Sequence, residues 1–162
     1  MTVENIYIYQ RRQQSFRQDT TIYESSARCS YLNEECESMK SPIKNQMNTV
    51  FVHVSDLLTS VEWYCRLLGQ TYEAEEVREP VYKMNINHYT GLLLDAGPRG
   101  EKKQVYPSKH PIFNFHTDEI ENAYSFVKEL GYNVDSPIER YDDLAFFTVK
   151  DPDGNIIMIC NR

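Results

Sequence analysis

The sequence predicts an α+β fold of two tandem βαβββ modules that form a curved mixed sheet around a cleft. Three observations support this prediction. A strand pattern followed by a helix pattern occurs twice, each helix pattern ends at a glycine, and short apolar runs follow both times. We expect the modules at about residues 48–97 and 111–162. A single module leaves one face of its sheet uncovered, and a second module can bury that face.

The first module begins with residues 49–54 (TVFVHV), whose β-branched and aromatic side chains are typical of a strand. Ser55 and Asp56 can cap the helix that follows, and Gly69 can end it. The apolar face of this helix consists of Leu58, Val61, Cys65 and Leu68. Further strands are expected at residues 70–76, 82–86 and 89–95, before a polar loop over residues 96–110.

The second module repeats this order. Residues 112–116 (IFNFH) form the strand pattern, Thr117 and Asp118 can cap the helix, and Gly131 can end it. Each residue of the second apolar helix face lies 62 positions after its counterpart in the first: Ile120, Ala123, Val127 and Leu130. The remaining strands are expected at residues 132–135, 144–149 and 156–160.

Residues 1–45 differ from the rest of the chain because they are polar and show no sustained periodicity. We expect a flexible N-terminal extension here, and a domain over residues 46–162. An arm that docks on a partner subunit is the alternative for the extension.

The composition excludes several classes of protein. The chain of 162 residues has 17 basic and 24 acidic residues, which disfavours nucleic acid as a partner. No apolar run approaches the roughly 20 residues of a membrane span, and no secretory signal is seen at the start. The four cysteines, at positions 29, 36, 65 and 160, lack zinc-site spacing. We therefore expect a cytoplasmic protein with reduced thiols and no membrane contact.

Two segments carry a resemblance to a known family. Residues 49–69 (TVFVHVSDLLTSVEWYCRLLG) and 147–159 (FTVKDPDGNIIMI) resemble the opening and the last hairpin of the vicinal-oxygen-chelate superfamily. This superfamily includes glyoxalases, bleomycin-resistance proteins and extradiol dioxygenases. The resemblance covers residues 47–162 and implies the glyoxalase/bleomycin-resistance-like fold. Its drug-sequestering members further imply a homodimer with the cleft at the two-fold interface.

The positions that hold metal ligands in enzymes of this family fall on Thr49, Ile112 and Met158. None of these side chains is a usual ligand for a divalent cation. We therefore expect no metal and no cofactor.

Strand alternation gives the candidate site residues. His53 and His116 are candidates for a general base, and the two histidines with Cys160 form an alternative, displaced metal site. Structural hydrogen bonding by the histidines is the simplest interpretation. Aromatic side chains at positions 63, 82 and 89 can stack on a planar or cationic ligand. The candidate ligand-binding residues are Phe51, His53, Trp63, Tyr89, Asn114, His116 and Met158.

Three functions remain open. The first is a small-molecule-binding protein with an aromatic cleft and no metal. The second is a metal-dependent lyase, isomerase or dioxygenase of the glyoxalase type with a displaced His/Cys site. The third is a non-catalytic interaction or regulatory module. Fold alone does not choose among them, and we expect the first because the usual ligand positions lack ligands.

Overall fold

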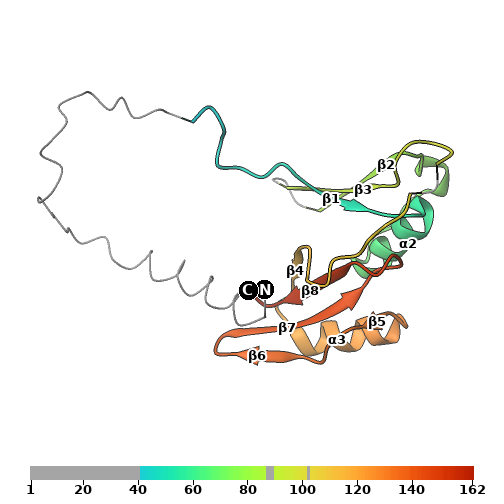
Figure 1. Cartoon of the computed structure of the whole chain (residues 1–162). Coiled ribbons are helices and arrows are strands. Elements are labelled where there is room, and N and C mark those ends of the chain that lie inside the picture. The colour runs from blue at the N-terminus through green and yellow to red at the C-terminus, as the bar shows by residue number, and fades with distance from the viewer. Residues whose placement is uncertain (1–40, 87–89, 102) are drawn as a thin grey trace, which may run out of the picture. The chain divides into compact units, whose positions relative to one another are not determined.

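The computed structural model describes residues 41–86, 90–101 and 103–162 (Figure 1). Contacts divide the chain into two units, residues 1–45 and 46–162. The helices and strands of the described residues all lie in the second unit. The predicted flexible extension falls almost entirely outside the described residues.

The first sheet has three strands in the order β1-β3-β2. Strand β1 (Thr49–His53) runs parallel to β3 (Gly91–Asp95), and β2 (Val81–Met84) runs antiparallel to β3. Helix α2 (Leu57–Leu67) packs on one face of this sheet. The Asp56 carboxylate accepts a hydrogen bond of 2.7 Å from the Thr59 N–H, which confirms the predicted N-cap.

The second sheet has the order β4-β8-β7-β5, and helix α3 (Ile120–Glu129) packs against it. Strand β4 is parallel to the last strand β8, and β7 is antiparallel to β8, as β2 is to β3 in the first sheet. This correspondence confirms the two-module α+β fold. The bounds are β4 (Asn114–His116), β5 (Asn133–Val134), β6 (Glu139–Tyr141), β7 (Leu144–Lys150) and β8 (Ile156–Cys160).

Three local predictions were wrong. Residues 70–76 contain a short 3-10 helix, η1 (Ala74–Glu76), instead of a strand, because closely spaced glutamates leave no apolar face to bury. Helix α3 is preceded by Glu119, whose side chain makes no capping bond. The Thr117 hydroxyl accepts only from the Glu119 N–H, and Asp118 pairs with His116, so neither predicted residue caps the helix. Strand β6 was missed because its polar sequence, ERY, joins β7 through backbone pairing.

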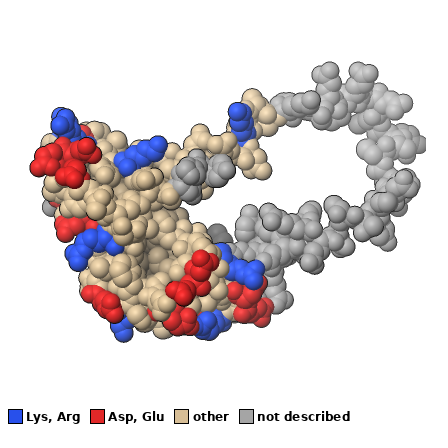
Figure 2. Space-filling view, turned by 180° about the vertical axis from the view of Figure 1, so that it is seen from behind, with Lys and Arg blue, Asp and Glu red and all other residues tan. Residues whose placement is uncertain are grey.

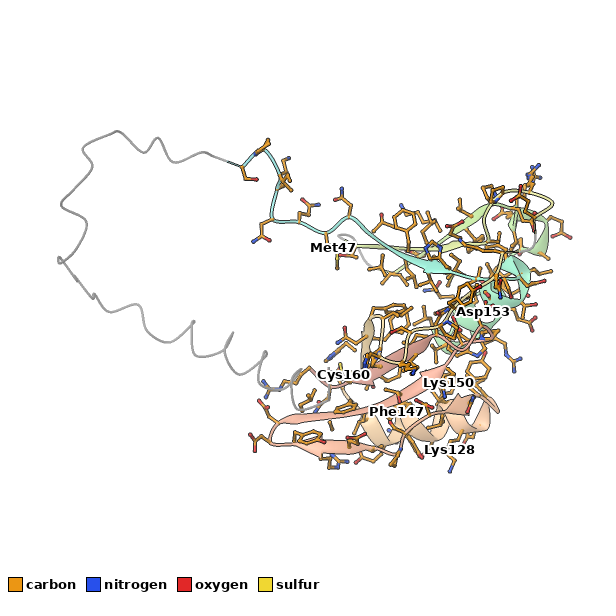
Figure 3. The ribbon with its side chains drawn as sticks, in the orientation of Figure 1. Met47, Lys128, Phe147, Lys150, Asp153 and Cys160 are labelled. Carbon is orange, nitrogen blue, oxygen red and sulfur yellow. The ribbon has the colours of Figure 1, made fainter. Side chains whose placement is uncertain are left out.

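Side chains near the start and end of the two modules join them. The Tyr64 hydroxyl of α2 donates to Asp151 at the end of β7 at 3.1 Å, and both side chains are buried. The Ser55 N–H donates to the Asp153 carboxylate, which Figure 3 shows in the turn before β8. The Asp-Pro-Asp-Gly turn of the second module therefore holds the strand–helix corner of the first.

Candidate functional site

A cleft of about 340 Å³ lies between β1, the start of the second module and the loop that joins the modules. We name it the His53 cleft. It is lined by Phe51, His53, Lys103, Gln104, Val105, Tyr106, Ser108, Ile112 and Asn155. Its volume is at the lower end of the range for small-molecule sites.

Strand alternation on β1 explains how the aromatic wall forms. Val52 and Val54 point into the core under α2, so Phe51 and His53 point the opposite way. The Phe51 side chain is 60% exposed, and Tyr106 across the cleft is 79% exposed. Large exposed aromatic side chains in a concave surface provide stacking area for a ligand.

A polar cluster of three side chains lies beside this aromatic wall. His53 Nδ1 lies 3.1 Å from Asp95 Oδ2, because residues 53 and 95 are paired in the parallel register of β1 and β3. Lys103 Nζ lies 2.6 Å from His53 Nδ1, 2.9 Å from Asp95 Oδ2 and 3.0 Å from the Asp95 carbonyl oxygen. The cluster thus connects two strands and the inter-module loop.

Asp95 is ionised at neutral pH in this setting. The hydrogen bond from Lys103 lowers the pKa of Asp95 and outweighs the opposing effect of burial, and the hydrogen bond from the Gly97 N–H makes a smaller contribution that also lowers the pKa. The negative charge of Asp95 therefore balances the positive charge of Lys103 at the edge of the cleft.

The back of the cleft is held by Asn155. Its Nδ2 donates to the His53 carbonyl oxygen at 3.2 Å and to Asp151 Oδ2 at 2.9 Å. Burial raises the pKa of Asp151, while the hydrogen bonds from Asn155 and Tyr64 oppose this shift. The Asp151 carboxylate accepts four hydrogen bonds in all, which compensate for its burial.

A larger cleft of about 610 Å³ lies on the other side of Lys103 and shares Lys103 and Gln104 with the His53 cleft. Its lining contains Asp95 and Glu101 but no aromatic or imidazole side chain. The His53 cleft is thus the better candidate for a planar ligand.

The structure brings only part of the predicted ligand set to this cleft. Phe51 and His53 line it, together with Ile112. Asn114 and His116 lie on β4 and are paired with Met158 and Cys160 of β8. None of these four residues lines the cleft.

The two remaining predicted ligand contacts are aromatic. Trp63 is only 8% exposed and stacks on Tyr132 with ring centroids 4.7 Å apart, so it contributes to the core. Tyr89 lies outside the described residues.

The residues do not fit a divalent metal. Thr49, Ile112 and Met158 offer no imidazole or carboxylate, and the described residues contain no group of three His, Cys, Asp or Glu side chains suited to a metal ion. The alternative set of His53, His116 and Cys160 is not assembled. His53 bonds Asp95, His116 bonds Asp118, and the Cys160 thiol lies at hydrogen-bond distance from Asn114 and the Arg162 carbonyl oxygen.

Sequence reasoning missed the residues that surround His53. Lys103 reads as one of two ordinary loop lysines, and Asp95 as the end of a strand. The parallel register of β1 and β3 would have placed Asp95 beside His53, but that register was not predicted. Nothing in the sequence distinguished Tyr106 from the other residues of the polar loop, or Asn155 from the residues of an ordinary turn.

Comparison with known proteins gives the family. The sequence profile of the Glyoxalase/Bleomycin resistance protein/Dioxygenase superfamily matches residues 46–159. The chain belongs to this superfamily. No curated protein sequence matches the chain.

Solved structures of the glyoxalase superfamily share the fold. Oxidase ChaP-H1 is 21% identical with a TM-score of 0.55, and the match covers 72% of this chain and 95% of that one. A glyoxalase/bleomycin resistance protein from Catenulispora acidiphila is 20% identical with a TM-score of 0.52, covering 72% and 98%. Lactoylglutathione lyase from Agrobacterium tumefaciens is 14% identical with a TM-score of 0.54, covering 75% and 96%. At these identities the likeness shows the fold alone.

The surface of the glyoxalase-superfamily domain has mixed charge. On the face shown in Figure 2, acidic and basic side chains of the described residues lie next to each other around the rim. Among the described helices, none has the length and apolar character that a membrane span requires.

Proposed function

We propose that this glyoxalase-superfamily domain binds a small planar molecule in the His53 cleft without a protein-bound metal. The observation that carries the proposal is the pair of exposed aromatic side chains, Phe51 and Tyr106, that line a cleft of suitable volume. The identities of Thr49, Ile112 and Met158 support binding without a metal.

The charges at the cleft favour a planar ligand that is not positively charged over a cationic one. Lys103 is the charged side chain in the lining, whereas its partner Asp95 does not line this cleft. A cation in the cleft therefore faces the ammonium group and not the carboxylate that neutralises it. We therefore keep the expectation of a planar ligand that stacks on the aromatic side chains, and we no longer expect a cationic ligand.

The first test is a titration with neutral planar aromatic compounds that include 2-naphthamide, followed by amide chemical shifts in two-dimensional NMR. We expect saturable shifts that cluster on β1 and on residues 103–108. Phe51→Ala should weaken binding by about tenfold, because it removes a stacking face worth about 1.4 kcal/mol.

Phe126→Ala is the matched control, since Phe126 is also an exposed phenylalanine but lies on α3. It should leave the affinity unchanged. Absence of saturable binding by every compound, or equal effects of the two substitutions, would refute the proposal.

A homodimer is part of this proposal. Phe51 and Val81 are exposed on the face of the first sheet that α2 leaves uncovered, and exposed apolar side chains on one face favour association. Sedimentation equilibrium should give twice the mass of one chain. A monomer at all concentrations would refute the dimer but not ligand binding.

We further propose a reducing compartment such as the cytoplasm. Cys65 and Cys160 are free and buried, as expected for thiols that act as small core side chains. Titration of the unfolded protein with a thiol reagent, after isolation under non-reducing conditions, would show whether the thiols are reduced.

A further inference from the structure

The polar cluster beside the aromatic wall suggests what kind of planar molecule the cleft takes. Lys103 has three N–H donors, and three acceptors lie within 3.0 Å of its nitrogen: two oxygens of Asp95 and His53 Nδ1. In the neutral tautomer of His53 that carries its hydrogen on Nε2, Nδ1 accepts from Lys103, and every donor of the lysine is occupied. The ammonium group then has no N–H left for a ligand.

Protonation of His53 changes this arrangement. Nδ1 then carries a hydrogen and can no longer accept from Lys103, but it can donate to Asp95 Oδ2 at 3.1 Å. One N–H of Lys103 is released, because the ammonium group turns away from the like-charged imidazolium nitrogen that lies 2.6 Å from it. The Nε2–H of His53, already present in the neutral tautomer, becomes a donor with positive charge. The protonated cluster therefore offers two charge-assisted hydrogen bonds, the kind that carboxylates and phenolates accept best.

The charge balance leads to the same conclusion. The charges of Lys103 and Asp95 cancel, and protonation of His53 brings the cluster to a net charge of +1. The other polar residues of the lining are uncharged: Gln104, Tyr106, Ser108 and Asn155. Glu101 lines the larger cleft on the far side of Lys103. The acidic group of a bound ligand is therefore the negative charge that can offset the repulsion between Lys103 and protonated His53 and so favour the protonated form of the imidazole.

We propose that the His53 cleft binds planar molecules that carry one acidic group, and that His53 takes up one proton when such a ligand binds. This inference rests on the proposed function, because it assumes that the cleft holds a planar ligand. It adds the chemical class of the ligand and makes its affinity depend on pH. Imidazole is the side chain that changes charge between pH 5 and 8.

The test compares 2-naphthoate with 2-naphthamide, which share a ring system but differ in charge. Calorimetric titrations at pH 7 in phosphate and in Tris measure proton uptake, since these buffers differ in ionisation enthalpy. We expect an uptake of about one proton for 2-naphthoate and none for 2-naphthamide. Uptake of one proton changes affinity about tenfold per pH unit, so the affinity for 2-naphthoate should be up to about 100-fold higher at pH 6 than at pH 8. The affinity for 2-naphthamide should not change.

Two variants assign the effect to the cluster. His53→Asn keeps an acceptor for Lys103 but cannot take up a proton, so proton uptake and the pH dependence for 2-naphthoate should disappear. Lys150→Met is the control, because Lys150 is also a lysine paired with an aspartate, Asp135, but on the second sheet. This variant should keep the full proton uptake.

The outcomes separate the two proposals. Equal affinities of both compounds at both pH values, or proton uptake that persists in His53→Asn, would overturn the acidic-ligand inference while ligand binding stands. If neither compound binds, nor any other neutral planar compound, the proposed function is overturned and this inference with it.

Discussion

Replacement of Tyr64 by phenylalanine tests how the two modules are held together. The Tyr64 side chain is fully buried, and its hydroxyl donates to Asp151 Oδ2 at 3.1 Å. Without the hydroxyl, Oδ2 keeps only the hydrogen bond from Asn155. A hydrogen bond to a charged group contributes about 1.5–3 kcal/mol, so we expect Tyr64→Phe to lower the free energy of unfolding by about 2 kcal/mol at pH 7.

Tyr132→Phe is the matched control. The Tyr132 hydroxyl donates to the Trp63 carbonyl oxygen at 3.0 Å, a similar distance to a neutral acceptor. Its loss should cost about 1 kcal/mol. Equilibrium urea unfolding of both variants and the parent protein at pH 7 gives the comparison.

The pH dependence adds a second criterion. Burial raises the pKa of Asp151, so the folded state binds a proton there more tightly than the unfolded state. The stability contributed by this group is full below its ordinary value of 3.8 and is lost as the pH rises through the raised pKa.

Tyr64→Phe removes a group that stabilises the ionised form and raises this pKa further. The loss of stability should therefore be small in acid and grow towards pH 7. Equal losses in Tyr64→Phe and Tyr132→Phe, or a loss that does not change with pH, would refute the reasoning.

Three further predictions concern the cleft. Asp95→Asn should lower the free energy of unfolding by less than about 1 kcal/mol, because the ion pair with Lys103 is partly exposed. The pKa of Asp95 is lowered in the folded state, so the loss should be present above the ordinary carboxyl pKa of 3.8 and absent in strong acid, as measured by urea unfolding. Gly97→Ala should cost about 1–2 kcal/mol because φ is +80°. Gly100→Ala should cost about the same, because φ is +81° there and an added Cβ at 97 meets the flexible Lys103 side chain only at an ordinary contact distance of 3.4 Å. Elemental analysis after incubation with Zn²⁺, Ni²⁺, Mn²⁺ or Fe²⁺ should find no stoichiometric metal; one ion per chain would refute metal-free binding.

The fold could be predicted from the sequence to the extent that apolar periodicity determines it. Both helices and the last strand were placed to within about two residues of their observed bounds, because each helix has a periodic apolar face and the last strand is a short, continuous apolar run buried on both sides. Residues 70–76 were predicted wrongly because Tyr72 and Ala74 alternate with polar residues as in a strand, whereas the clustered glutamates prevent burial. β6 is held by backbone pairing with β7 and by one aromatic contact, Tyr141 on Phe146, which leaves no periodic pattern in its sequence.

The site was harder to predict because its residues come from distant segments. Phe51 and His53 followed from alternation along one strand. Lys103 and Asp95 join them only through strand register and a loop path, and neither appears in local periodicity. A single sequence therefore does not predict which side chains contact a given histidine when they come from distant segments.

The cleft is a seam between the two repeats. Phe51 and His53 come from the first repeat, Ile112 and Asn155 from the second, and Lys103 from the segment between them. A single repeat would carry only one wall of the cleft. A substitution in one repeat can therefore alter one wall while the residues of the opposite wall stay as they are.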